Sequence, residues 1–215
     1  MYKMIHMGRV RLLNVLAEAA LIVFSILLAL YTNRWREEHA AKQRVARDLA
    51  AIRVELRQNQ AILADVLPYH QREIETFGRF LERPDLEQRV RGKDMFEAVR
   101  DNKDVLMWHG VWQPHVTPSS LSDTAWKTAV ANGDLPYMSP DLVKALTDYY
   151  SFQDSGLEHD IELISQIYMS PPPYDRSQTV TMLRTLQGTF SQLADHEGSL
   201  LQQADKTLQA IPGNR

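Results

Sequence analysis

The sequence contains no cysteine, which excludes disulfide bonds, thiolate metal ligands and cysteine nucleophiles. It also lacks an excess of charge of either sign, because 24 lysines and arginines stand against 27 aspartates and glutamates. Domains that bind nucleic acid usually carry a clear positive excess, so we expect no nucleic-acid partner. The chain of 215 residues is long enough for one ordinary domain and an anchoring segment.

Catalytic motifs are missing as well. The sequence has no glycine-rich phosphate loop, no nucleophile elbow and no Walker motif. Its seven histidines do not occur at the HxxxH or HExxH spacing that places two metal ligands on one helix face. We therefore predict no catalytic residues, no cofactor and no metal site.

A long apolar run does occur, at residues 12–31, where the sequence reads LLNVLAEAALIVFSILLALY. At about 1.5 Å per residue, this run is as long as the roughly 30 Å hydrocarbon layer of a bilayer. Tyr31 and Trp35 follow at the level of the lipid headgroups, where half-wet aromatic rings are favoured. The sequence thus predicts a basic tail (residues 1–11), a transmembrane helix (residues 12–31) and a helical soluble domain (residues 32–215).

A cleavable signal peptide is the main alternative to this anchor. Signal peptides have shorter apolar cores and end at a small-residue cleavage site, whereas this run continues into the charged stretch TNRWREEHAAKQ. Topology has two interpretations. Five basic residues after the run, against three before it, favour a cytoplasmic domain. A short basic tail before an uncleaved apolar segment is typical of a signal-anchor, which favours a periplasmic domain, and we adopt this second interpretation.

Three polar residues, Asn14, Glu18 and Ser25, interrupt the predicted span at helical spacing. A carboxylate inside a membrane costs about 2–3 kcal/mol on insertion scales. Glu18 could avoid this cost by lying shallow, by protonation or by reaching the interface. Alternatively, the three residues form a stripe that contacts a partner helix or a second copy of the chain. The sequence leaves both interpretations open.

The soluble domain shows two heptad-like seams, which predict two long helices packed as an antiparallel pair. An intermolecular coiled coil through the first seam is the alternative. Asn59 lies within the first seam and Glu197 interrupts the second. We expect the first helix to end at Leu67 because Pro68 follows it. Further helices are predicted at residues 69–82, 85–102, 121–131, 139–168 and 175–211. Pro118-Ser119-Ser120 precedes the 121–131 helix, Asn132-Gly133 closes it, and Ser139-Pro140 opens the next helix. The predicted fold class is therefore all-α, a transmembrane helix that continues into a helical bundle.

The stretch from Asn102 to Pro118 is rich in proline, glycine and aromatic residues and is expected to be a loop. Its aromatic and histidine side chains, together with one tryptophan beyond the loop, form a candidate pocket: Trp108, His109, Trp112, His115 and Trp126. Packing of these rings against the end of the bundle is the plainer interpretation.

The junction Asn33-Arg34-Trp35-Arg36-Glu37 resembles a family of uncharacterised bacterial membrane-anchored proteins, in which a single span ends in Asn-x-Trp-x-Glu. A second block is similar to the same family and consists of Thr117-Pro118, Ala125-Trp126, residues 132–135, Leu142, Leu146 and Tyr149-Tyr150. The two blocks cover about a quarter of the chain. The resemblance implies a single-span architecture in the bacterial inner membrane and implies no particular activity.

These features favour a membrane-anchored, non-enzymatic interaction or scaffold protein of the bacterial envelope. Its expected partners are the lipid bilayer and a partner helix or a second copy bound through the span. Two alternatives remain from the sequence: a ligand-sensing helical domain that works with a partner, and an enzyme or metal site around His109 and His115.

Overall fold

The computed structural model describes residues 2–101, 121–169 and 175–213, without the side chains of residues 2–17, 168 and 169. Every regular element in these ranges is a helix. The elements are α1 (Tyr2–Leu81), α2 (Leu86–Val90), α3 (Met95–Arg100), α5 (Thr124–Ala131), η1 (Leu135–Tyr137), α6 (Pro140–Phe152), the π-helical η2 (Gln153–Glu158), α7 (His159–Met169), η3 (Arg176–Gln178) and α8 (Thr179–Ala210). The predicted all-α class is confirmed.

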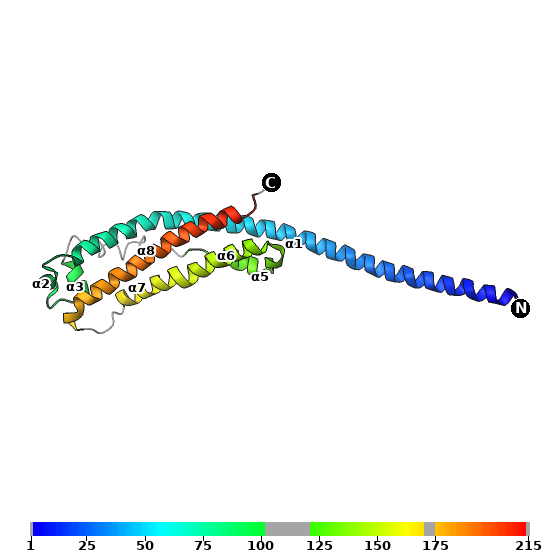
Figure 1. Ribbon diagram of the computed structural model, residues 1–215, viewed down its shortest axis with the longest axis horizontal. Coiled ribbons are helices and arrows are strands. Elements are labelled where there is room, and N and C mark those ends of the chain that lie inside the picture. The colour runs from blue at the N-terminus through cyan, green and yellow to red at the C-terminus, as the bar shows by residue number, and fades with distance from the viewer. Residues whose placement is uncertain (1, 102–120, 170–174, 214–215) are drawn as a thin grey trace. The chain divides into compact units, whose positions relative to one another are not determined.

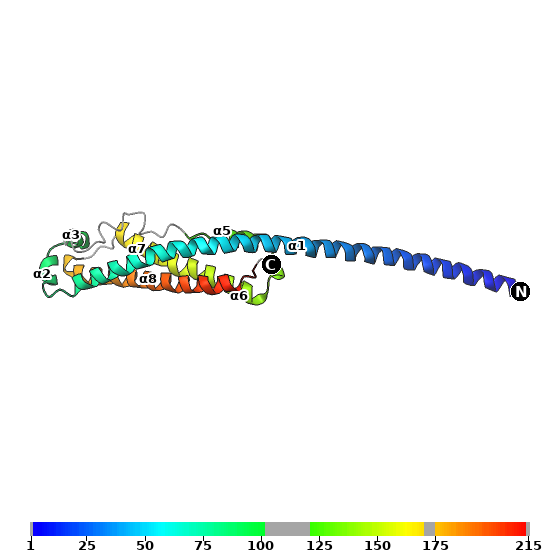
Figure 2. The same ribbon diagram turned by 90° about the horizontal axis from the view of Figure 1, so that it is seen from above.

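The chain divides into two compact units, Met1–Arg47 and Asp48–Arg215. The first unit is the N-terminal part of α1. The second is a bundle in which α8 lies along the rest of α1, and α6 and α7 lie along α8 (Figures 1 and 2). The sequence does not place a boundary at this point, because both heptad spacing and helical propensity continue through it.

The two long helices of the bundle, α1 and α8, run antiparallel. Arg53 donates to the carbonyl oxygen of Pro212 at 2.6 Å, and Gln60 donates to Asp205 at 2.5 Å. Farther along, His70 contacts Glu197, so residue numbers rise on one helix as they fall on the other. The predicted packing of the two seams is confirmed. The buried seam residues are Ile52, Leu56, Asn59, Leu63, Val66, Leu183, Leu186, Phe190, Leu193, Leu200 and Ala204.

The predicted end of the first helix at Leu67 is wrong, because α1 continues through Pro68 to Leu81. A proline inside a helix removes one backbone hydrogen bond and crowds the preceding turn, at a cost of about 3 kcal/mol. Buried residues flank it on both sides, among them Val66, His70 and Phe77. Packing of these side chains in the bundle offsets the local cost.

The single helix predicted over residues 85–102 is also wrong, since two short helices, α2 and α3, replace it. Gly92 between them has a φ of 72°, a left-handed conformation that ends a helix. Asp94 then starts α3 with a capping box, in which Asp94 accepts from the backbone N–H of Glu97 and Glu97 accepts from that of Asp94.

The predicted helix end at Asn132-Gly133 and the predicted helix start at Ser139-Pro140 are confirmed, whereas the predicted start at residue 121 is wrong, because α5 begins at Thr124 with Asp123 at the N-cap position. Gly133 has a φ of 72°, its N–H donates to the carbonyl of Val130, and Asp134 N–H donates to that of Ala129. This is a Schellman motif at the end of α5. Ser139 accepts from Leu142 N–H at the start of α6, with Pro140 at the first helical position. The predicted continuation past Gly156 is confirmed, through the π-helical η2 into α7.

Candidate functional site

Large apolar side chains lie exposed along α1 in the first unit. Ten of them between Leu21 and Trp35 are exposed by 52–71%. The four consecutive residues 21–24 are all in this set, and successive helix positions point about 100° apart, so the exposure extends around the whole helix. We call residues 18–35 the exposed apolar segment. Soluble monomers rarely expose a contiguous apolar surface of this kind, which marks it as an interaction surface.

The hydroxyl groups of Ser25 and Thr32 in the exposed apolar segment are satisfied within the helix. Ser25 Oγ donates to the carbonyl of Leu21 at 2.8 Å, and Thr32 Oγ1 donates to that of Leu28 at 2.7 Å. Neither hydroxyl hydrogen therefore needs water or a partner. Glu18 is exposed. The side chain of Asn14, the third member of the predicted stripe, lies outside the described residues.

Within the described residues, no helix is both long enough and apolar enough to cross a membrane. The predicted span begins at Leu12, and the side chains of residues 12–17 are outside the described part of the chain.

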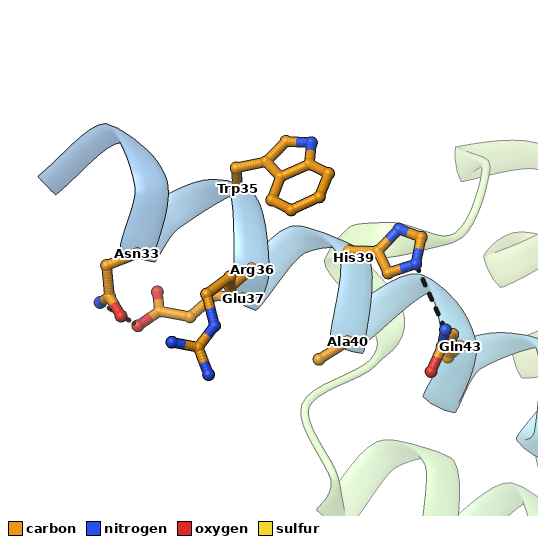
Figure 3. A pocket seen from close by; sticks show the side chains of 7 residues that line it. All are labelled: Asn33, Trp35, Arg36, Glu37, His39, Ala40 and Gln43. Carbon is orange, nitrogen blue, oxygen red and sulfur yellow. Dashed lines mark hydrogen bonds between the residues drawn. The ribbon is translucent and has the colours of Figure 1, made fainter. Parts of the chain in front are cut away.

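The predicted interface anchors Tyr31 and Trp35 are both exposed, by 71% and 59%. Trp35 stacks on His39 one turn later, with ring centroids 5.8 Å apart and an interplanar angle of 16°. A shallow pocket lies here, lined by Asn33, Trp35, Arg36, Glu37, His39, Ala40 and Gln43 (Figure 3). All seven residues belong to one helix, so the pocket is an open surface and does not enclose a small molecule.

Both acidic residues of this junction have a partner one turn away. Asn33 donates to Glu37 at 2.7 Å, and Arg34 pairs with Glu38 at 3.1 Å. In the described part of the chain, Arg36 and Lys42 have no acidic partner. Arg36 and Lys42 are therefore exposed cations outside any ion pair with the described residues.

Four of the five predicted pocket residues, Trp108, His109, Trp112 and His115, lie outside the described residues. Trp126 on α5 is half-buried and stacks on Tyr150 of α6, with ring centroids 5.6 Å apart and an interplanar angle of 1°. The Tyr150 hydroxyl donates to Glu55 at 2.7 Å. Trp126 is thus part of the packing between α5 and α6.

Glu55 on α1 is a buried carboxylate that no sequence pattern indicates. It accepts from Ser122 Oγ at 2.6 Å and from the backbone N–H of Ala125 at 2.9 Å. A carboxylate in this position accepts hydrogen bonds from backbone N–H groups at the start of α5 that have no partner within the helix. Its negative charge also interacts favourably with the positive end of the helix dipole. Burial and the hydrogen bond to Glu55 raise the pKa of Tyr150, which keeps its hydroxyl a donor. Glu55 therefore links α1, α5 and α6.

Asn59 lies one turn after Glu55 and is buried. Its amide nitrogen donates to the carbonyl of Ser122 at 2.8 Å and to Gln153 at 3.3 Å, and its oxygen accepts from Ser122 N–H at 2.9 Å. The sequence identified Asn59 as the polar member of a seam. The partners, 63 and 94 residues away, fix the register of α1 against the rest of the bundle.

A second buried cluster joins α1 to α8. His70 Nδ1 lies 2.9 Å from both carboxylate oxygens of Glu197, and both side chains are at most 1% exposed. Glu73, one turn after His70, is also buried. Burial raises the pKa of Glu73, while the charges of His70 and Arg72 act in the opposite direction. Glu197 interrupts the second seam because it pairs with His70 in the core.

His196, the residue before Glu197, makes a similar histidine–carboxylate contact with α7. His196 Nδ1 lies 2.5 Å from Asp160, which is 1% exposed and also accepts from Gln192 at 3.1 Å. The His196 ring packs edge-on against Phe152, and the π-helical turn brings Gly156 close to both rings. Adjacent residues of α8 therefore bind two neighbouring helices through histidine–carboxylate pairs. The only sequence signal for either pair was a polar residue inside an apolar seam.

These clusters connect helices. Glu55, Asp160 and Glu197 accept hydrogen bonds from donors of the bundle, whereas Oε2 of the buried Glu73 has no hydrogen-bond partner among the described residues. Among the residues that the structure describes, no group of three or more histidine, aspartate or glutamate side chains is arranged to hold a metal ion. The exposed apolar segment, with the cations Arg36 and Lys42 that follow it, is not part of the packing of the bundle and is the candidate functional site.

Comparison with known proteins identifies no relative: no family model matches the chain, and neither a curated protein nor a solved structure does.

Proposed function

We propose that the chain is a membrane-anchored, non-enzymatic interaction or scaffold protein of the bacterial envelope, held by one transmembrane helix over residues 12–31. The observation that carries this proposal is the exposure of large apolar side chains on every side of α1 between Leu21 and Leu30. Apolar surface in water costs about 25 cal/mol per Å². Hydrocarbon removes this cost on all faces at once, whereas one docking partner would cover only one face.

The length of the segment supports a span when the sequence before it is included. Residues 18–31 alone would extend about 21 Å, which is short of the roughly 30 Å hydrocarbon layer. Residues 12–17, LLNVLA, lie in the same helix and add about 9 Å. The internal hydrogen bonds of Ser25 and Thr32 are compatible with lipid, because they leave no hydroxyl hydrogen unpaired.

An interaction role is supported by the polar residues of the same helix. Glu18 is exposed and lies inside the apolar stretch, where a lone carboxylate is costly. Pairing of Glu18 with a polar group of another helix, aided by Asn14 and Ser25, removes this cost. The partner is then a second copy or another membrane protein that presents a polar group at the same depth.

Membrane fractionation of the full chain tests the anchor. We expect it in the membrane pellet, resistant to an alkaline carbonate wash and released by detergent. The variant Val23→Arg/Leu27→Arg carries two charges into the span, costs about 5–7 kcal/mol of insertion free energy, and should leave the membrane. The control Val54→Arg/Val130→Arg changes two exposed residues of the bundle and should stay. Recovery of the unmodified chain in the soluble fraction would overturn the proposal.

Crosslinking in intact membranes tests the partner. We expect an adduct with a second copy or another protein, and we expect Glu18→Leu to reduce it without releasing the chain from the membrane. A chain that is recovered only as an uncrosslinked monomer would contradict the interaction role and leave the anchor standing.

The side of the membrane follows from the signal-anchor interpretation, which predicts a single-pass inner-membrane protein with a periplasmic bundle. A reporter that is active only in the periplasm, fused at the C-terminus, should be active. Activity of a cytoplasm-only reporter at the same position would reverse the orientation.

A further inference from the structure

We infer that the helix surface formed by Trp35, Arg36, His39 and Lys42, here called the basic face, binds the headgroups of anionic phospholipids. This inference rests on the proposed membrane anchor and adds the class of lipid that surrounds it. Each of the four residues is exposed. At 100° per residue they lie within a 120° arc of the helix, with Gln43 between them.

The two cations of the basic face, Arg36 and Lys42, form no ion pair with neighbouring carboxylates in the described part of the chain. Glu38 pairs with Arg34, and Glu37 keeps its charge but accepts from the neutral amide of Asn33, so each carboxylate bonds to a residue of the preceding turn. Figure 3 shows Glu37 turned back toward Asn33, while Trp35 and His39 project together from another side of the helix.

The position of Arg36 suits a headgroup phosphate. It follows Tyr31 by five residues, or about 8 Å along the helix, and the headgroup layer extends about 5–8 Å beyond the hydrocarbon. Lys42 lies about 16 Å beyond Tyr31, where its long side chain and a Debye length of about 8–10 Å still couple it to the surface. Arg47, about 24 Å away, lies beyond this range.

The basic face also carries a stacked aromatic pair, Trp35 and His39, which makes it amphipathic. Trp35 stacks on His39 at 5.8 Å, and His39 lies 3.3 Å from Gln43. A tryptophan ring at the headgroup level is half apolar and half polar, like the layer around it. The open pocket beside it is shallow and one-sided, which suits a headgroup attached to the bilayer. Charge and amphipathic surface together therefore point to an anionic lipid.

Spin-labelled lipids test the inference on the full chain reconstituted in phosphatidylcholine vesicles. The fraction of label immobilised by the protein is compared between phosphatidylglycerol and phosphatidylcholine probes. We expect a preference for phosphatidylglycerol that weakens as salt is raised. One cation near the surface is worth up to about fivefold, so Arg36→Gln should lower the preference by up to that factor.

Arg47→Gln is the matched control, because it makes the same charge change on the same helix but farther from the bilayer. Its lipid preference should equal that of the unmodified chain. An equal loss in both variants, or no preference in the unmodified chain, would overturn the local site. If inorganic phosphate abolished the preference more strongly than chloride at equal ionic strength, the basic face would bind free phosphate, and the lipid assignment would be wrong.

The same experiment separates this inference from the proposed function. A chain that immobilises both probes equally is in the bilayer but has no anionic site, which overturns only the inference. A chain that immobilises neither probe is not in the bilayer, which overturns both.

Discussion

Leu27 and Leu56 belong to the same helix, yet Leu27 is 59% exposed and Leu56 is fully buried. The difference extends to polar residues. Glu18 is exposed within an apolar stretch, whereas Glu197 is 0% exposed and pairs with His70. In the bundle, most large apolar side chains face inward, and the buried carboxylates Glu55, Asp160 and Glu197 have hydrogen-bond partners, as folding in water favours. In the exposed apolar segment the apolar surface faces outward, and we propose that lipid supplies its favourable surroundings.

The comparison predicts that substitutions in the bundle change its folding stability and that substitutions in the exposed apolar segment do not. The same experiment, unfolding of the full chain in mild detergent followed by circular dichroism, measures both. The cases below run from the largest expected effect to the smallest.

The buried His70–Glu197 pair should show the largest effect. Glu197→Ala leaves His70 without its partner in the core, which should lower the free energy of unfolding by about 3–5 kcal/mol. Urea unfolding measures the change. The double variant His70→Phe/Glu197→Leu should recover most of the loss, because it removes both polar groups together. Asp148→Ala, at an exposed pair with Lys144, is the control and should cost less than about 1 kcal/mol. Similar losses for Glu197→Ala and Asp148→Ala would show that the pair is not buried.

Leu56 and Leu27 directly test the comparison between the bundle and the exposed apolar segment. Leu56→Ala should lower the free energy of unfolding of the bundle by about 2–5 kcal/mol, through lost burial and the cavity left behind. Leu27→Ala makes the same chemical change at an exposed site and should leave the urea midpoint unchanged. A matching loss at Leu27 would mean that the exposed apolar segment packs on the bundle and is not a separate interaction surface.

Helix positions and boundaries that depend on a few neighbouring residues were predictable from the sequence. The seams, the Asn132-Gly133 stop and the Ser139-Pro140 start each depend on a few neighbouring residues, and the structure has them where predicted. Pro68 was misjudged because its local cost is large, while the packing that offsets it comes from a helix more than a hundred residues away. Sequence rules that consider only neighbouring residues include the cost of the proline but not the packing energy from a distant helix.

The polar contacts of the bundle could not be predicted for the same reason. Glu55 caps a helix that begins about 70 residues later, and His70 meets Glu197 after 127 residues. Each looks in sequence like an ordinary charged or polar residue on a helix. The exposed apolar segment is the opposite case, since its composition alone singled it out, and the exposure of its side chains agrees with an outside partner.

Two glycines should give effects of opposite sign within the bundle. Gly133 has a φ of 72°, so Gly133→Ala should lower the free energy of unfolding by about 1 kcal/mol. Gly188 is an exposed residue inside α8, and a Cβ there would have nothing within 4 Å. Gly188→Ala should therefore raise the stability by about 0.5–1 kcal/mol. Thermal unfolding of the two variants in parallel would show this, and a loss at Gly188 would contradict the open surface of α8.

Glu73 should give the smallest effect, and this effect should depend on pH. Burial raises the pKa of its carboxyl above the ordinary 4.5, so the folded protein keeps a proton that the unfolded chain releases. The stability that this group contributes is therefore present below the unfolded pKa and is lost as pH rises through the folded pKa.

Glu73→Gln removes the charge and keeps the shape, so it should raise the Tm at pH 7 by about 2 °C. The gain should disappear near pH 3.5, where the carboxyl is protonated in both states. Glu75→Gln, at an exposed position two residues later, makes the same change without burial and should have no such pH dependence. An equal gain at both pH values would show that the ionised Glu73 carboxylate is tolerated in the core, and that the core of the bundle is less dry around His70 than the burial of its side chains indicates.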